Sequence, residues 1–287
     1  MLSWKIGDVT VTRVVEMQTD VPSGGAVPFI LDATPDSLKA MPWLYPDFVT
    51  PEGLMRLSIH ALLVDAPGVK LVVDTCMGND KPRHLLGGNA LHTAFLSDIA
   101  AAGFAREKVD AVVCTHLHVD HVGWNTMLVD GKWVPTFPNA RYLVGRIEYE
   151  HWRSEAEGEM TEIMADSVGP IFDSGLAQTV ELDHRISPEL RLVPTTGHTP
   201  GHVSLMIESK GESAVITGDM MHHPCQIGRP HWSAEFDSDK TASAITRKAK
   251  VAEWADRPIL VIGTHFAAPT AGRIVREGGG YRFTTSA

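Results

Sequence analysis

The segment 115–123 constrains this chain most. It reads Thr-His-Leu-His-Val-Asp-His-Val-Gly and follows the apolar run 110–114, so four side chains that can bind a metal lie within six residues: His116, His118, Asp120 and His121. A continuous helix would distribute them around its circumference, whereas an extended stretch that turns after a strand can direct all four to one point. Imidazoles with a carboxylate suit zinc or a similar first-row divalent ion, while calcium and magnesium prefer oxygen ligands. We therefore predict a transition-metal site here. The alternative is a set of ordinary surface or core histidines.

Three more predicted strands end in residues of the same chemical kind. The strand 190–194 leads to the loop 196–202, Thr-Gly-His-Thr-Pro-Gly-His, in which two glycines and a proline favour a tight turn that presents His198. The strand 214–217 ends just before Asp219, and the strand 259–262 just before His265. Open α/β sheets assemble active sites at the carboxyl ends of their strands, so we expect these residues to meet the first group.

Hydrophobic periodicity predicts the remaining elements. Residues 4–16 are typical of a β-hairpin, 55–65 and 69–75 of paired strands, 91–102 of an amphipathic helix, and 141–145 of a short strand. Residues 146–156 and 159–172 are predicted helices whose acids, Glu148 and Asp166 among them, are expected to form solvated faces. A long polar helix is predicted over 238–256, capped by Asp237 or Ser238, before a closing hairpin over 273–283.

A long segment, 17–54, shows no clear periodicity. It is rich in proline and glycine and also carries Phe29, Trp43, Tyr45 and Phe48. Aromatic residues argue against disorder, so we predict an ordered loop that lies near the site as a substrate wall or a subunit contact. A loop that only wraps the surface is the alternative.

Composition excludes several classes of protein. The chain has 25 basic and 35 acidic residues, a net charge of −10, and no run of lysine or arginine, which argues against nucleic acid as the main partner and favours a small neutral substrate. No segment reaches the 18 apolar residues of a membrane span, and no secretory leader is apparent, so we expect no membrane association and a cytoplasmic location. The three cysteines, Cys76, Cys114 and Cys225, are too separated to indicate a disulfide framework.

Together these motifs resemble the metallo-β-lactamase superfamily: His116-x-His118-x-Asp120-His121, then His198 in Gly-His-Thr-Pro-Gly-His, then Asp219, then His265. The resemblance implies an αββα sandwich, an α/β fold in which two mixed β-sheets are flanked by helices, formed by residues 1–287 as a single domain. The order of the motif parts is specific for the fold and the metal centre, and less so for the substrate.

The resemblance also implies a ligand set. One divalent ion would be held by His116, His118 and His198, a second by Asp120, His121 and His265, with Asp219 bridging. Zinc is the expected metal, with cobalt, manganese or iron as alternatives. Two ions about 3.5–4 Å apart would activate a shared water as a metal-bound hydroxide, and Asp120 would orient it and carry a proton to the leaving group.

Within the superfamily the chain most resembles the branch of methyl parathion hydrolase and of lactonases such as dihydrocoumarin hydrolase, through residues 236–240 and 279–283. Acyl-homoserine lactonases carry a tyrosine three residues after the bridging aspartate. His222 stands there in this chain, either contacting a substrate oxygen or packing behind the site. We expect a hydrolase of lactones or aryl carboxylic esters, with an apolar pocket formed by the segment 29–48, Trp124, Phe236 and Phe266.

Other functions stay open at this point. An organophosphate triester hydrolase and a glyoxalase II-like thioesterase would use the same residues, and a non-catalytic metal-binding protein is the alternative of a different class. Structural zinc sites normally have a closed set of four ligands, often thiolates, and no cysteine pair of that kind is present. The resemblance and the apolar loop 17–54 also suggest a homodimer.

Overall fold

A computed structural model describes residues 1–26, 28–83 and 89–285, and it contains two large mixed β-sheets. The first has the order β1-β2-β3-β4-β5-β8-β9. Its strands are β1 (Ser3–Ile6), β2 (Val9–Val21), β3 (Met55–Ala66), β4 (Val69–Val73), β5 (Ala111–Cys114), β8 (Arg141–Gly145) and β9 (Ala177–Val180). The pairs β4–β5, β5–β8 and β8–β9 are parallel, and the pairs β1–β2, β2–β3 and β3–β4 are antiparallel.

The second sheet has the order β10-β11-β12-β13-β14-β15. Its strands are β10 (Leu190–Pro194), β11 (Val203–Ser209), β12 (Glu212–Ile216), β13 (Ile259–Ile262), β14 (Ala271–Glu277) and β15 (Gly280–Thr284). Here β12 and β13 are parallel and the other pairs are antiparallel. A separate hairpin consists of β6 (Thr126–Val129) and β7 (Lys132–Pro135), which the sequence pattern did not predict.

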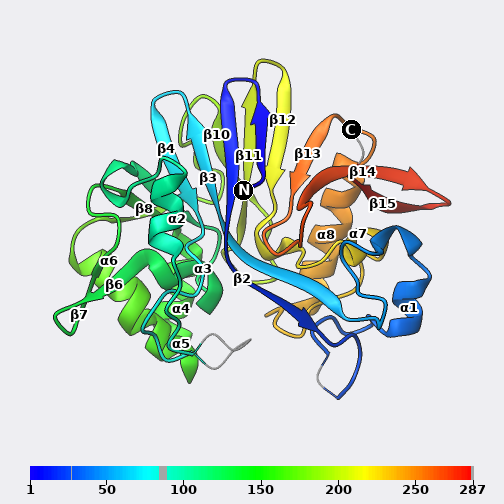
Figure 1. Ribbon diagram of the computed structural model, residues 1–287, viewed down its shortest axis with the longest axis horizontal. Helices are drawn as coiled ribbons and strands as arrows, with labels where there is room; N and C mark the ends of the chain where they lie inside the picture. The colour runs from blue at the N-terminus through cyan, green and yellow to red at the C-terminus, as the bar shows by residue number, and fades with distance from the viewer. Residues whose placement is uncertain (27, 84–88, 286–287) are drawn as a thin grey trace.

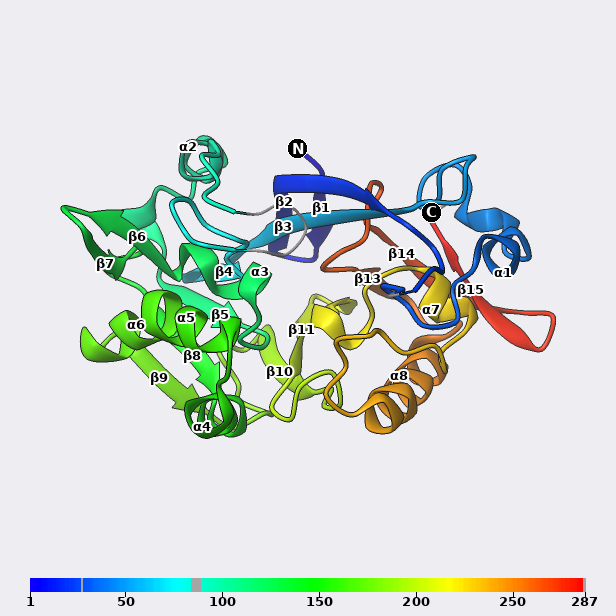
Figure 2. The ribbon, with the colours of Figure 1, turned by 90° about the horizontal axis from the view of Figure 1, so that it is seen from below.

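Helices cover the outer face of each sheet, as Figures 1 and 2 show. On the side of the first sheet lie α2 (Phe95–Ala101), α3 (Val119–Val122), α4 (Arg146–Glu155), α5 (Glu159–Ile163) and α6 (Gly169–Asp173), with a π-helical segment at Met164–Val168. On the other side lie α1 (Pro35–Lys39), α7 (Cys225–Gly228) and α8 (Lys240–Trp254).

Three clusters of buried apolar side chains hold these layers together. One lies between the two sheets and includes Val64, Val113, Leu205 and Ile216, while the other two lie between each sheet and its helices. Strands covered on both faces have continuous apolar sequences, which is why 110–114 and 259–262 were recognisable. The predicted αββα sandwich is confirmed.

The segment 17–54 differs from the prediction at its start. β2 continues to Val21 because its residues pair with β3 as far as the Val21–Met55 partners, so the first five residues of the segment are strand. Further along, Leu38, Met41, Leu44 and Phe48 are buried in the cluster beneath the second sheet. Residue 27 lies outside the described part. The segment therefore contributes several side chains to the core and does not merely wrap the surface.

Two local predictions were wrong. The side chain of Asp239 caps α8 by accepting a hydrogen bond from the Ala242 N–H at 2.9 Å, so neither Asp237 nor Ser238 is the cap. Asp166 is buried and paired with Arg83 at 2.6 Å, because the π-helical segment turns its carboxylate inward. The sequence of a helix with this many acids does not indicate which acid faces a buried cation.

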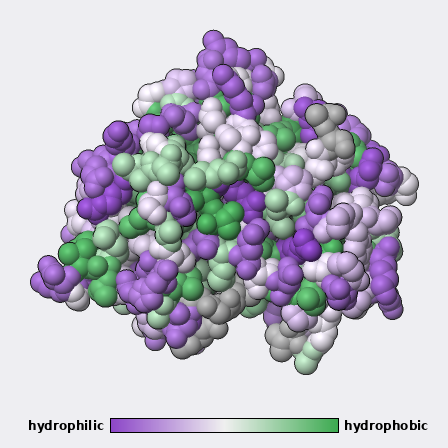
Figure 3. Space-filling model, in the orientation of Figure 1, coloured by the Kyte–Doolittle hydropathy of each residue, from purple (hydrophilic) through white to green (hydrophobic). Residues whose placement is uncertain are grey.

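No helix in the described ranges is long and apolar enough to cross a membrane. On the face seen in Figure 3, hydrophobic areas are interspersed with hydrophilic residues.

Candidate metal centre

Four strand ends bring the candidate ligands to one edge of the sandwich. β5 leads to an extended stretch followed by the short helix α3, the β10–β11 loop follows β10, a 3-10 turn (Gly218–Met220) follows β12, and a loop follows β13. These segments carry, in that order, His116, His118, Asp120 and His121, then His198, then Asp219, then His265. The structure brings all seven predicted residues together.

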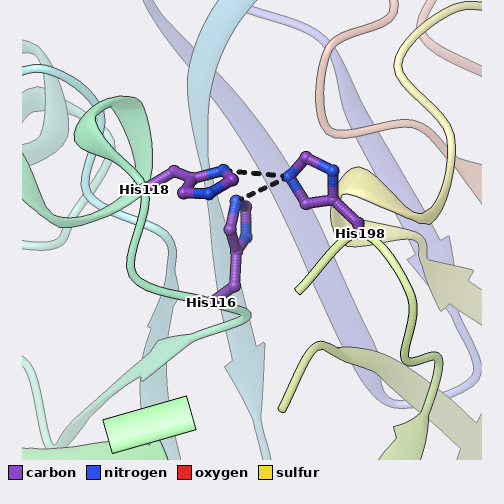
Figure 4. A group of neighbouring side chains, drawn as sticks. All are labelled: His116, His118 and His198. Carbon is purple, nitrogen blue, oxygen red and sulfur yellow. Dashed lines mark hydrogen bonds between the residues drawn. The ribbon is translucent and has the colours of Figure 1, made fainter. Parts of the chain in front are cut away.

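Three imidazoles form the first group (Figure 4). The Nε2 atom of His198 lies 3.0 Å from Nδ1 of His118 and 3.2 Å from Nε2 of His116. His116 and His198 are fully buried, and His118 is partly exposed. Burial, followed by the neighbouring imidazoles, lowers the pKa of His116 and of His118 well below the usual value. Neutral rings pointing their nitrogens at one another offer lone pairs to a cation.

A carboxylate and two imidazoles form the second group. The Nε2 atoms of His121 and His265 are 3.2 Å apart, and each lies 3.5 Å from a carboxylate oxygen of Asp120. Both groups satisfy a simple geometric condition for a metal site, since their ligand atoms lie within 4.8 Å of one another.

Asp219 lies between the two groups. Its Oδ2 atom is 3.2 Å from Nε2 of His121 and 3.6 Å from Nε2 of His198, so one oxygen faces both groups. Burial alone would raise the pKa of this carboxyl, but the surrounding imidazoles, His121 first among them, hold it well below its usual value. Its Oδ1 is buried 3.1 Å from Nε2 of His265, and it makes no well-aligned hydrogen bond with any described residue. A carboxylate in this state needs positive charge nearby, and the donor set fits two cations with a shared ligand.

The comparison with known protein families agrees with this geometry. Residues 54–265 match the family described as the Metallo-beta-lactamase superfamily. The chain belongs to the metallo-β-lactamase superfamily. It is accordingly a metal-dependent hydrolase, as its sequence predicted.

Curated relatives in this superfamily include N-acyl homoserine lactonases. One from Bacillus sp is 26% identical over 228 residues, which are 75% of this chain and 84% of the relative. One from Bacillus thuringiensis is 25% identical over 242 residues, which are 80% of this chain and 90% of the relative. The methyl parathion hydrolase branch stays a prediction.

Solved structures share the fold. The hydrolase AbOPH of the beta lactamase superfamily has a TM-score of 0.81 and 26% identity, covering 100% of this chain and 97% of its own. AidC, a dizinc quorum-quenching lactonase, has a TM-score of 0.76 and 18% identity, covering 99% and 97%. At 18% identity, the similarity to AidC shows a shared fold alone.

Three of the buried candidate ligands, His121, His198 and His265, have a hydrogen-bond partner on the outer ring nitrogen. His121 Nδ1 lies 2.9 Å from Oδ2 of Asp74. His265 Nδ1 lies 3.1 Å from the backbone oxygen of Ser58. Each acceptor takes the N–H of the outer nitrogen, so in the neutral ring the inner nitrogen carries the lone pair.

Sequence reasoning missed Asp237 as the partner of His198. Its Oδ1 lies 2.9 Å from His198 Nδ1. Burial alone would raise the pKa of Asp237. The hydrogen bond with His198 and the nearby positive charges outweigh burial, so the pKa lies well below its usual value. The sequence contains no indication of this contact, because residues 198 and 237 belong to different loops.

Sequence reasoning also placed Glu148 wrongly in a solvated face. Glu148 is buried, and its two oxygens accept hydrogen bonds from the Leu117 N–H at 3.2 Å and the Gly201 N–H at 2.9 Å. It therefore joins the loop of His116 and His118 to the loop of His198. The Trp152 Nε1–H, one turn further along α4, donates to the same carboxylate at 2.7 Å.

His222 lies beside Asp219 on the wall of the site. Its Nε2 atom is 3.2 Å from Asp219 Oδ2, and its Nδ1 is buried without a hydrogen bond to any residue that the structure describes. The edge of the ring packs against Phe29, with centroids 5.5 Å apart. Burial lowers the pKa of His222 although Asp219 opposes this, so the ring is neutral near pH 7.

A cavity of about 270 Å³ opens over the ligands. Its apolar walls come from two sides: Phe29 and Phe236 on one, and Trp152, Met160 and Ile163 on the other. The predicted pocket was partly wrong. Trp124 is buried against Phe95, with stacked rings 5.7 Å apart, and Phe266 packs against Phe283 in the core, so neither lines the cavity.

Proposed function

We propose that this chain is a dinuclear metal hydrolase that opens lactones or cleaves aryl carboxylic esters. The observation that supports this most is the position of Asp219, whose Oδ2 faces both the His116, His118 and His198 group and the His121 and His265 group. A carboxylate shared in this way is suited to bridge two cations, and zinc matches the nitrogen-rich donor set.

In this proposal each group holds one ion. His116, His118 and His198 hold the first, Asp120, His121 and His265 the second, and Asp219 both. Two divalent ions bound there would lower the pKa of a bound water and act as Lewis acids towards the carbonyl of the substrate. The outer acceptors Asp74, Asp237 and the Ser58 carbonyl orient three of the rings, so that in the neutral ring the inner nitrogen carries the lone pair that would bind a metal.

Asp120 and His222 are the residues we propose to touch the reacting atoms. Asp120 is the more exposed of the two site carboxylates, 14% against 4% for Asp219, and it lines the cavity. One of its oxygens can therefore orient a water and carry a proton to the leaving oxygen. His222 can donate from Nε2 to a substrate oxygen that approaches Asp219.

The cavity supports a neutral, apolar substrate. Its walls contain the acids Asp120, Glu159 and Asp219, and no lysine or arginine occurs among the described residues that line it. These described walls therefore offer no basic side chain to bind an anionic substrate such as a glutathione thioester. The curated relatives named N-acyl homoserine lactonase support a lactone as the substrate class.

A substrate panel tests the proposal. Protein loaded separately with zinc, cobalt, manganese or iron is assayed with dihydrocoumarin, an acyl-homoserine lactone, an aryl ester, a phosphotriester and a glutathione thioester. We expect two metal ions per chain and the largest kcat/KM on a lactone or aryl ester. A dominant rate on the phosphotriester would favour the organophosphate alternative. Bound metal without turnover of any substrate would favour the non-catalytic alternative.

The predicted homodimer and cytoplasmic location are part of the proposal. Light scattering of the purified protein and fractionation of the source cells would test them.

A further inference from the structure

We infer that Arg247 is a positioning residue that sets the metal affinity of the site from behind His198 and Asp219. The inference rests on the proposed function, because it concerns the binding of metal by those two residues. Arg247 does not contact the cavity. It lies on the inner side of α8 and is fully buried.

The guanidinium of Arg247 uses all its hydrogen-bonding capacity. Arginine has five N–H donors, and five acceptors surround this one. Nε donates to the Met220 carbonyl at 2.7 Å, Nη1 to the carbonyls of Pro230 and Trp232 at 3.3 and 2.6 Å, and Nη2 to Ser243 Oγ at 2.7 Å and Asp237 Oδ2 at 3.3 Å. The side chain therefore fixes three segments relative to one another.

Two of these segments position proposed metal ligands. Met220 directly follows Asp219 in the 3-10 turn, so the bond to its carbonyl holds the turn that presents the shared carboxylate. Asp237 contacts Arg247 through Oδ2 and His198 through Oδ1. One cation thus positions residues on both the β10–β11 loop and the turn after β12.

The charge of Arg247 matters as well as its shape. Asp237 is fully buried, and its Oδ2 accepts hydrogen bonds from Arg247 and from the Ala234 N–H at 3.0 Å. Its Oδ1 is left to accept the Nδ1–H of His198, which makes the facing Nε2 a stronger ligand. Without Arg247, Asp237 would lose its permanent counter-charge and His198 its orientation.

Arg83 provides a matched control. It is also a fully buried arginine paired with one aspartate, Asp166, at 2.6 and 2.9 Å. In the described part of the chain, the hydrogen bonds of Arg83 go to Pro82, Asn89, Asp166 and Ser167, none of which is a proposed metal ligand. Loss of Arg83 should cost stability without changing metal binding.

The experiment compares Arg247→Met, Arg247→Lys, Asp237→Asn and Arg83→Met with the wild type. Zinc dissociation constants are measured by competition with a chromophoric chelator, and the visible absorption of cobalt-loaded protein reports ligand geometry. We expect Arg247→Met and Asp237→Asn to bind one of the two ions about 10–100-fold more weakly, with an altered cobalt spectrum. The zinc affinity of Arg247→Lys should lie between the affinities of these two variants and that of the wild type. Arg83→Met should bind zinc as tightly as the wild type does.

Wild-type affinity and spectrum in folded Arg247→Met would overturn the inference. If that variant does not fold, unchanged affinity in both Arg247→Lys and Asp237→Asn would overturn it instead. A wild type that binds no metal would overturn the proposed function and the inference together, whereas two ions bound equally well by all variants would overturn the inference alone.

Discussion

The backbone N–H of Asp219 donates a hydrogen bond to Nε2 of His202 at 2.8 Å. The other ring nitrogen of His202, Nδ1, lies 3.0 Å from the Thr195 carbonyl, so the ring carries its proton there and accepts at Nε2. Burial lowers the pKa of His202 to about 3, which keeps it neutral. His202 thus supports the shared carboxylate from behind instead of binding a metal.

Gly218 leaves the space that this contact requires. It has a φ of +54°, and an added Cβ would lie 2.5 Å from Nε2 of His202. We expect Gly218→Ala to displace His202 or Asp219 and so to reduce bound metal, measured by elemental analysis. Gly211→Ala is the control, since Gly211 has a φ of +82° with open space around it. Backbone strain of about 1 kcal/mol would then lower its Tm without changing its metal content. Full metal content in folded Gly218→Ala would contradict the argument.

Asp120→Asn should remove the proton carrier while keeping a neutral oxygen in the second group. We expect kcat to fall by about 10²–10⁴-fold with a folded protein, measured by steady-state kinetics alongside metal analysis and circular dichroism. His198→Ala should also reduce turnover by orders of magnitude, through loss of metal. Asp36→Asn, at a carboxylate that is 93% exposed on α1, should leave kcat unchanged. Retained activity in metal-loaded Asp120→Asn would count against its role.

Removal of metal should lower stability. The ligands converge only in the folded chain, so a metal present at 100 times its Kd stabilises the fold by about 2.7 kcal/mol per site. We expect the Tm to fall on treatment with a chelator and to recover on addition of zinc. In His198→Ala the same treatment should change the Tm less. An identical Tm with and without chelator would be inconsistent with a preformed centre.

Lys81 should make stability depend on pH. Burial lowers its pKa to about 8, with Arg83 adding to this and Asp166 opposing it. In the unfolded chain the pKa is near 10.5, so between pH 8 and 10.5 the unfolded state binds more protons. The penalty of burying the charged amine is present below pH 8 and is relieved as the pH rises, by about 3 kcal/mol in all.

The measurement is the difference in unfolding free energy between the wild type and Lys81→Met across this range. Burial raises the pKa of the thiols of Cys76, Cys114 and Cys225, which opposes the trend, but both proteins share these groups. We expect the unfolding free energy of the wild type to increase relative to that of Lys81→Met as the pH rises. If the unfolding free energies of the two proteins changed with pH in parallel, Lys81 would not have a lowered pKa in the folded state.

Phe236 should affect substrate binding more than stability. It is 41% exposed at the cavity and packs against Phe29, with ring centroids 5.6 Å apart. An aromatic contact with an aryl substrate contributes about 1 kcal/mol, so Phe236→Ala should raise KM for an aryl ester about fivefold and leave Tm nearly unchanged. Ile245→Ala removes an apolar residue that is 64% exposed on α8 outside the cavity, and it should change neither value. An unchanged KM in Phe236→Ala would place the aryl group elsewhere.

The sequence by itself determined the sandwich and the candidate ligands. Fully covered strands have continuous apolar sequences, and polar residues directly after them, such as Asp219 after β12, mark the edge where strands end. This pattern is local in the sequence, so it can be recognised without knowledge of the fold. Tertiary structure decided what surrounds the ligands. Asp237 and Glu148 act on loops far from them in sequence, and one turn of a helix determines whether an acid meets solvent or a buried loop. Partnerships of this kind depend on which surfaces pack together, and only the assembled layers determine that.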